Sequence, residues 1–198
     1  YLSGMSSSTN IPLQTLAGAY NGVRDGYYED IFLARFNLNG AREWATIIDT
    51  DYYADRCAIE IGPNDQVYMA GYFSSTYLFR SVFTMLNPGG SAYYQATRTL
   101  TKPTGTSTTS NDESFIIEFN SSGQKVWATY FGSDGQERLS KITVTPDGSI
   151  FLVGNGERRY GLATALPKLK TAGQYYDGTH ISGPKLYLTK FNADRSWN

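Results

Sequence analysis

Few residues of this chain could carry acid–base or nucleophilic chemistry. The sequence contains one histidine, His180, and one cysteine, Cys57. His180 lies near Asp177 and Ser182 in a turn-rich stretch; these are residue types that could form a nucleophilic triad, but their spacing does not indicate triad geometry. A zinc site built from histidine and cysteine is excluded, because each type occurs only once. Cys57 lies in a strand-like apolar stretch and is expected to be a structural thiol.

Carboxylates are the remaining candidates for chemistry. Asp49, Asp51, Asp55, Asp134 and Glu137 lie in two corresponding loops, and a pair of carboxylates could hydrolyse a glycosidic bond. Asp49, Asp51 and Asp55 also resemble a calcium loop, although the glycine and the terminal glutamate of an EF-hand are missing. Because the acids recur in two related segments, we expect a structural role for them. We assign no catalytic residue and no cofactor, and calcium is the one candidate metal.

The two loops belong to a long internal repeat. Residues 31–72 and 114–155 share an aromatic–asparagine pair, a Trp-Ala-Thr triplet and a closing glycine at a constant separation. The opening of the unit recurs once more near the C-terminus, and residues 1–5 match its end. Such a repeat determines the architecture before any single residue is interpreted. The matched positions are Phe36, Phe119 and Phe191; Trp44 and Trp127; Arg56 and Arg138; Gly71 and Gly154.

Each repeat contains four strand-like runs separated by turn signals such as Asn39-Gly40 and Asp147-Gly148. Four short antiparallel strands in a unit of this length are typical of a β-propeller blade. We therefore predict an all-β chain that forms part of one β-propeller domain, with two whole four-stranded blades and parts of two more. The expected divisions are a closing strand at 1–5, blades at 31–72 and 114–155, and the start of another blade at 186–198.

The repeated residues are expected to hold the blades together. A blade alone leaves both faces of its sheet exposed, so it needs neighbours. The phenylalanines end equivalent strands and are predicted to fill the wedge between blades, with the tryptophans in the same layer. The repeated glycines are expected at sites of close backbone approach or unusual backbone angles. The two arginines each follow a carboxylate and are expected to form loop ion pairs.

Two long insertions, 73–113 and 156–184, are predicted to lie between blades and to emerge on one rim. Aromatic residues on such loops could stack on sugars or contact proteins. Alternatively, they cover the rim and pack locally, and the sequence leaves both readings open. The candidate binding residues are Tyr77, Phe79, Tyr93, Tyr94, Tyr160, Tyr175 and Tyr176.

The second repeat resembles the bacterial SBBP repeat, whose name stands for seven-bladed β-propeller. The first repeat departs from the pattern at 49–53, and the last is two residues short between Phe191 and Trp197. The resemblance implies a scaffold with a binding surface and without shared catalytic residues, in a secreted or cell-surface protein of the kind found in Bacteroidota. It rests on Phe119-Asn120, Gly123, Trp127, Thr129-Tyr130-Phe131-Gly132, Pro146-Asp147-Gly148 and Gly154, and on the N-terminal YLSGMSSSTNIP.

The amino-acid composition indicates which classes of partner to expect. There are 17 basic and 18 acidic residues without a basic run, so no nucleic-acid partner is expected, and no apolar stretch is long enough to span a membrane. We expect a non-enzymatic scaffold, adhesion or interaction module, a fragment of a larger secreted or cell-surface protein. Its partners would be the rest of its own propeller, other surface or secretion proteins, or carbohydrate. The alternative is a glycoside hydrolase or lyase built on a propeller.

Overall fold

The computed structural model describes residues 1–14, 16–20, 22, 29–49, 53–75, 84–97, 111–133, 135–158 and 183–197, with backbone only at 53–56, 74–75, 111, 157–158 and 183–185. Within these ranges, no helix is long and apolar enough to cross a membrane. The strands are β1 (Leu2–Ser6), β2 (Asp30–Phe36), β3 (Arg42–Ile48), β4 (Tyr53–Ile61), β5 (Val67–Ser75), β6 (Asn111–Phe119), β7 (Lys125–Phe131), β8 (Gln136–Val144), β9 (Ile150–Arg158) and β10 (Gly183–Phe191).

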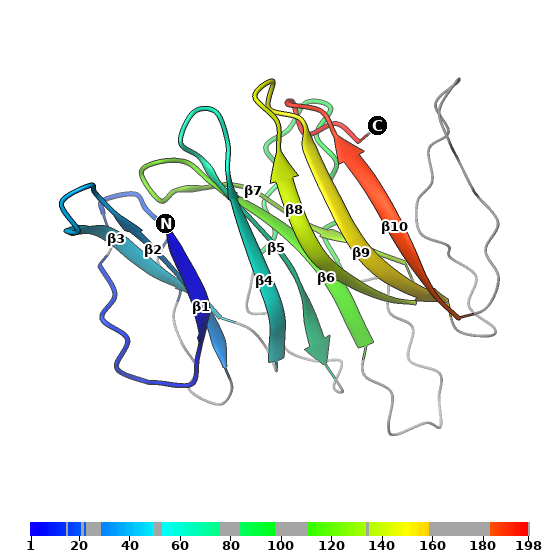
Figure 1. Ribbon diagram of the computed structural model, residues 1–198, viewed down its shortest axis with the longest axis horizontal. Coiled ribbons are helices and arrows are strands. Elements are labelled where there is room, and N and C mark those ends of the chain that lie inside the picture. The colour runs from blue at the N-terminus through cyan, green and yellow to red at the C-terminus, as the bar shows by residue number, and fades with distance from the viewer. Residues whose placement is uncertain are drawn as a thin grey trace.

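The strands form three antiparallel sheets that lie side by side in Figure 1. The first sheet has the order β1-β2-β3, the middle sheet β4-β5-β6-β7 and the last sheet β10-β9-β8. The prediction of an all-β chain built from small antiparallel sheets is therefore confirmed.

The sheets are offset from the sequence repeats by two strands. The repeat 31–72 contributes β2 and β3 to the first sheet, but β4 and β5 to the middle sheet. The repeat 114–155 is divided in the same way between the middle and last sheets. The boundaries predicted for the blades are therefore wrong, because each predicted blade is shared by two neighbouring sheets.

The two ends of the sheets carry connections of different length. Tight turns join β2 to β3, β4 to β5, β6 to β7 and β8 to β9 at one end. At the other end, 76–110 links β5 to β6 and 159–182 links β9 to β10. Both insertions therefore join paired strands of one sheet, rather than two blades as the sequence led us to expect. We call these the turn end and the loop end.

The middle sheet is covered on both faces. Met69, Phe115 and Phe119 pack against the first sheet, whereas Ile116 and Trp127 pack against the last sheet. Successive residues of a strand point to opposite faces, so a strand covered on both sides needs apolar residues throughout. This explains the continuous apolar run at the start of β5, 67–70.

The closing glycine of each repeat faces an aromatic ring on the neighbouring strand. A Cβ atom on Gly154 would lie 2.6 Å from Tyr187 Oη and 2.6 Å from the carbonyl oxygen of Arg138. Gly4 and Gly154 lack the positive φ of the turn glycines, so close approach explains their recurrence. The directly opposed pairs are Gly4 with Phe32, Gly71 with Phe115 and Gly154 with Tyr187.

We expect Gly154→Ala to lower the free energy of unfolding by about 2–3 kcal/mol, because its Cβ would meet a backbone carbonyl that β8 holds in place. The matched control is Gly40→Ala, at a turn where φ is +77° and no atom lies within 4 Å of the added Cβ. The control should cost about 1–2 kcal/mol through its backbone conformation alone. Urea denaturation of both variants tests this, and an equal or smaller cost at Gly154 would refute the close-approach explanation.

Candidate functional site

The two repeated tryptophans lie in equivalent positions between sheets. Trp44 and Trp127 are almost completely buried. The Nε1 of Trp44 donates a hydrogen bond of 3.0 Å to the carbonyl of Ser121 in the middle sheet's turn. The Nε1 of Trp127 donates one of 3.0 Å to the carbonyl of Tyr93, and its ring meets that of Phe191 in the last sheet, with centroids 5.6 Å apart. Trp44 therefore links the first sheet to a turn of the middle sheet, and Trp127 links the middle sheet to Phe191 of the last sheet.

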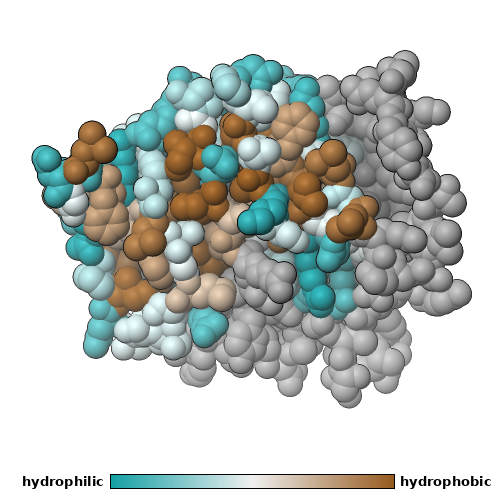
Figure 2. All heavy atoms as spheres, in the orientation of Figure 1, coloured by the Kyte–Doolittle hydropathy of each residue, from teal (hydrophilic) through white to brown (hydrophobic). Residues whose placement is uncertain are grey.

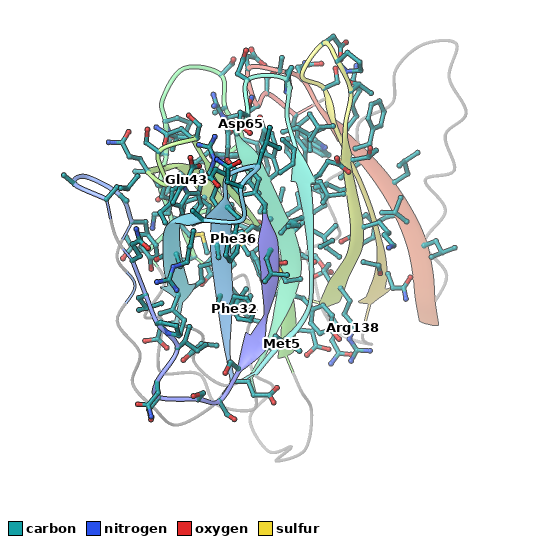
Figure 3. The ribbon with its side chains drawn as sticks, turned by 60° about the vertical axis from the view of Figure 1, so that its left-hand side comes forward. Met5, Phe32, Phe36, Glu43, Asp65 and Arg138 are labelled. Atoms are coloured by element: carbon teal, nitrogen blue, oxygen red, sulfur yellow. The ribbon has the colours of Figure 1, made fainter. Side chains whose placement is uncertain are left out.

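Phe36 differs from its two counterparts. Phe119 and Phe191 are fully buried, whereas Phe36 is 41% exposed, so the predicted burial of Phe36 between sheets is wrong. Phe119 faces the preceding sheet. Phe36 points in the equivalent direction, and therefore lies on the outer face of the first sheet. Figure 3 shows Phe32 and Phe36 along β2 on this face. No sheet covers it among the residues that the structure describes.

A second repeated element was not recognised in the sequence. The segment at 12–14 and 16–20 runs along β3 and the segment at 84–95 runs along β7, through single antiparallel bridges from Gln14 to Ala45 and from Leu86 to Ala128. Tyr20 and Tyr93 occupy the same place in the two segments. Each donates its backbone N–H to the turn of the next sheet, at Gly123 and Arg195 respectively. The signal was present as an Ala-Tyr pair at 19–20 and 92–93, with a glycine directly before the first pair and one residue further away from the second.

Tyr93 is therefore a packing residue. Its ring lies 5.7 Å from the centroids of both Phe131 and Phe191. Its hydroxyl is hydrogen-bonded to Gln95 at 3.0 Å. Burial, with a smaller contribution from the Glu113 carboxylate, raises the pKa of Tyr93 to about 12. Tyr94 is exposed, and it is the one candidate binding aromatic that the described residues present to solvent.

Two charged residues occupy turn positions that otherwise favour glycine. Asp65 and Arg195 have φ values of 59° and 68°, and they are the two non-glycine residues with positive φ in the described ranges. Arg195 takes the place of Gly123 in the preceding sheet's turn, because both donate their N–H to the asparagine that opens the turn. Asp65 corresponds in the same way to Gly148. A left-handed backbone at a residue with a Cβ costs about 1–2 kcal/mol.

The side chains at these two turns form ion pairs between neighbouring sheets. Arg35, on β2, contacts Asp65 Oδ2 at 2.5 Å and donates to the Ser121 carbonyl at 2.5 Å. Arg195 binds the buried Glu118 of β6 through Nε at 2.5 Å and a second nitrogen at 2.7 Å. Hydrogen bonding to Glu118 raises the pKa of Arg195. Both turns with a positive φ therefore take part in an ion pair between one sheet and the next.

The backbone bridge between Phe191 and Trp197 shows the register of the last turn. Trp197 bridges to Phe191, as Lys125 lies opposite Phe119 and Arg42 opposite Phe36. The turn therefore has the usual length, and Trp197 is not the counterpart of Trp127. The last repeat was read as two residues short because Trp197 was matched to Trp127, and the pairing register shows that this match was wrong.

A buried polar cluster lies at the loop end, between the middle and last sheets. Glu113 of β6 and Glu137 of β8 point at the same place, since a Cβ on Gly132 would lie 2.6 Å from Glu113 Oε1 and 2.8 Å from Glu137 Oε2. Gln95 donates to Glu113 at 2.8 Å. Ser133 donates its N–H at 3.0 Å and its hydroxyl to Glu137. These bonds fix the loop that connects the two sheets.

The neighbouring arginine has a structural partner. Arg138 forms an ion pair of 2.5 Å with the buried Asp112, and its guanidinium lies 5.6 Å from the centre of the Tyr72 ring. The pairing register places Arg138 opposite Asn155 and Asp55 opposite Tyr72. Arg138 therefore corresponds to Asp55 rather than to Arg56, and the sequence alignment of the two arginines was wrong by one residue.

Of the three calcium candidates, only Asp49 has a described side chain. Asp49 is buried, the side chain of Asp55 is not described, and Asp51 lies outside the described residues. Within the described ranges, no three histidine, cysteine, aspartate or glutamate side chains gather as a metal site requires. Other predicted residues also lie outside these ranges: Tyr77, Phe79, Asp134, Tyr160, Tyr175, Tyr176, Asp177, His180 and Ser182.

Cys57 packs against the core between the first and middle sheets, and burial raises the pKa of its thiol to about 12 from 9.0. We expect little reaction of the folded chain with a thiol reagent at pH 8, and rapid reaction in urea, because the thiolate is the reactive form. Above about pH 9 the unfolded thiol loses its proton before the folded one, so this group makes folding less stable as pH rises. Equal reaction rates with and without urea would contradict this.

The outermost faces of the array carry exposed apolar residues. Leu186 and Leu188 project from β10 of the last sheet, and Leu2 and Phe36 project from the first sheet. Figure 2 shows hydrophobic residues gathered on the viewer's side of the molecule, from the first sheet across to the last. These faces are the parts of the described surface that are best suited to contact another molecule.

Comparison with known proteins adds no further constraint on the site. No protein-family model matches the chain. No curated protein matches it either.

Proposed function

We propose that this chain is a segment of a β-propeller and acts as a non-enzymatic scaffold or interaction module of a larger secreted or cell-surface bacterial protein. The observation that carries the proposal is the use of the repeated residues. Trp44 and Trp127, with Phe119 and Phe191, are buried between sheets. Residues that recur are thus used for packing one sheet on the next.

The arrangement of the sheets supports a radial array. Contacts between the first and middle sheets involve the edge strand β4, and those between the middle and last sheets involve its counterpart β8. The opposite edges, β3 and β7, are instead lined by the segments that carry Tyr20 and Tyr93. Sheets that approach along one edge and diverge along the other fan out around an axis, as propeller blades do. The resemblance to SBBP repeats supports the surface location.

Amide hydrogen exchange can test the proposal that each sheet of the scaffold is stabilised by its neighbours. If each sheet is stabilised by its neighbours, as in other repeat architectures, Phe191→Ala in the last sheet should reduce amide protection in β6 and β7. Protection in β2 and β3 should change much less, because β2 packs on β4 of the middle sheet and both strands lie away from the last sheet (Figure 1). A uniform loss of protection across all three sheets would contradict the proposal.

The buried carboxylates favour a second candidate, an enzyme that cleaves polysaccharide. Glu113 and Glu137 meet beside Gly132, and retaining glycosidases use two closely spaced carboxyl groups. Their hydrogen bonds to Gln95 and Ser133 favour the structural role. The release of reducing ends from a polysaccharide panel separates the two. Activity that Glu137→Gln abolishes, while the matched change Glu60→Gln on β4 leaves it intact, would establish the enzyme.

A further inference from the structure

The outer face of the last sheet presents apolar residues at positions that are buried elsewhere. Leu188 is 69% exposed, whereas its counterparts Leu33 and Ile116 are fully buried against the following sheet. Leu186 is 80% exposed, although its counterpart Ile31 is fully buried. This face therefore has the composition of one that packs on another sheet.

The outer face of the first sheet has the complementary character. Leu2 is 52% exposed, and its counterpart Met69 is fully buried against the preceding sheet. Phe36 and Leu13 are also exposed, while their counterparts Phe119 and Met85 are buried there. The first sheet thus exposes the residue positions through which the middle sheet packs against the sheet before it.

The charges on the two faces are compatible. Lys190 is the counterpart of Arg35 and Glu118, the two residues that contact the next sheet's turns. Its ammonium group lies 5.9 Å from the centre of the Phe151 ring on this face. In the first sheet, the turn at 37–41 has no charged residue, and its Leu38 carbonyl corresponds to the Ser121 carbonyl that accepts from Arg35. Nothing in this turn would repel Lys190.

We propose that the outer face of the last sheet binds the outer face of the first sheet of a second copy of this chain. The contact would repeat the geometry by which the first sheet packs on the middle one and the middle on the last. Leu188 of one copy would pack against Phe36 of the other, with Lys190 beside the turn at 37–41. This inference rests on the proposed scaffold, with a second copy of the chain, rather than further sheets of the same polypeptide, as the neighbour at the two outer faces.

The contact joins two different faces, so each copy can bind one neighbour through each face. Such a heterologous contact produces closed rings when the rotation between copies closes, and open chains when it does not. Self-association of the wild-type chain should therefore increase with concentration.

Two single substitutions test the pairing of faces by analytical ultracentrifugation. Leu188→Asp should block the last face and Phe36→Asp the first face, so each variant alone should be monomeric. An equimolar mixture should form a 1:1 dimer and stop there, because each variant retains the face that the other lacks. Tyr94→Ser is the control, since it removes an exposed aromatic ring away from both faces and should associate like the wild type.

A charge test examines the register of the contact. Gly40→Asp places a carboxylate at the turn position that Arg195 occupies in the last sheet, where it would face Lys190 of the other copy. It should tighten association about 2- to 5-fold at low salt, and Lys190→Glu in the same chain should reverse this gain. Unchanged affinity in both variants would overturn the proposed register.

The outcomes separate this inference from the proposed function. A wild-type chain that is folded by circular dichroism but monomeric from about 1 μM to about 1 mM would overturn the docking proposal, without affecting the scaffold that hydrogen exchange tests. A mixture that forms larger aggregates instead of stopping at 1:1 would overturn it as well. If either aspartate variant fails to fold, Leu186→Asp and Leu2→Asp block the same two faces.

Discussion

Trp127→Ala is expected to lower the free energy of unfolding by about 3–5 kcal/mol, the usual cost of removing a fully buried large aromatic side chain. The ring is completely buried between the middle and last sheets. The substitution would remove the edge-to-face contact with Phe191 and the hydrogen bond to the Tyr93 carbonyl, leaving a cavity that the rigid sheets cannot close. Equilibrium denaturation in guanidinium, followed by circular dichroism, measures the change.

The matched comparison is Trp44→Ala, because Trp44 holds the equivalent place between the first and middle sheets. The two substitutions should have similar costs. Trp127→Phe should recover most of the packing but leave the Tyr93 carbonyl without its donor, at a cost of about 1 kcal/mol. Leu38→Ala, at a fully exposed turn residue, is expected to have no measurable effect. A cost at Trp127 below that of an ordinary surface substitution would contradict the packing role assigned to the repeat.

Arg195→Ala is expected to cost about 3 kcal/mol, because it leaves the carboxylate of Glu118 buried without its two charged hydrogen-bond donors. Arg195→Gly removes the same ion pair but relieves the positive φ, so it should be less harmful by about 1 kcal/mol. The chain with glycine at position 195 would then be more stable than the chain with alanine. Gly40 and Gly123 occupy the same position in the turns of the other two sheets. Thermal and chemical unfolding of both variants at equal ionic strength give the difference.

A double-mutant cycle isolates the ion pair itself. Glu118→Gln combined with Arg195→Gln should be milder than the sum of the two single changes, since no charge is then left buried alone. Strict additivity would show that Glu118 and Arg195 stabilise the chain independently. The exposed pair of Arg35 with Glu43 serves as the reference, because both side chains are partly in solvent and such pairs contribute at most about 1 kcal/mol.

Features that depend on periodicity were accessible from the sequence. The strand runs, the tight turns and the burial of Trp44 and Trp127 all followed from local patterns that recur. The repeated glycines were correctly linked to close approach, because a strand glycine commonly marks a neighbouring group in the space of its missing side chain. That group proved to be a ring directly across the sheet, at Phe32, Phe115 and Tyr187.

Features that depend on which strands pair could not be predicted from the sequence. A repeat shows only its period, and any four consecutive strands satisfy it equally well, so the two-strand offset of the sheets could not be read from the chain. Arg138 was mismatched for another reason, because the match with Arg56 followed residue identity, although the constant separation of the other matched residues places Asp55 against Arg138. Phe36 was misassigned because its burial depends on a neighbour rather than on its own strand.

The charged turns could not be predicted for a different reason. A turn of this kind favours glycine at its left-handed position, and aspartate is tolerated there, but local propensity gives no reason to place arginine there. Arg195 is accounted for by its partner on another sheet, Glu118, and Asp65 is likewise paired with Arg35. Such departures from local preference are where long-range contacts outweigh local ones.

The offset between repeats and sheets bears on how this kind of chain can lengthen or shorten during evolution. Every junction between successive repeats lies inside a sheet, where β5 of one unit is hydrogen-bonded to β6 of the next along its whole length. A duplicated or deleted unit would therefore be spliced across an intact ladder, and the recombined gene would still encode complete interior sheets. Gain or loss of a unit would alter the size of the array while leaving the pairing at each seam unchanged.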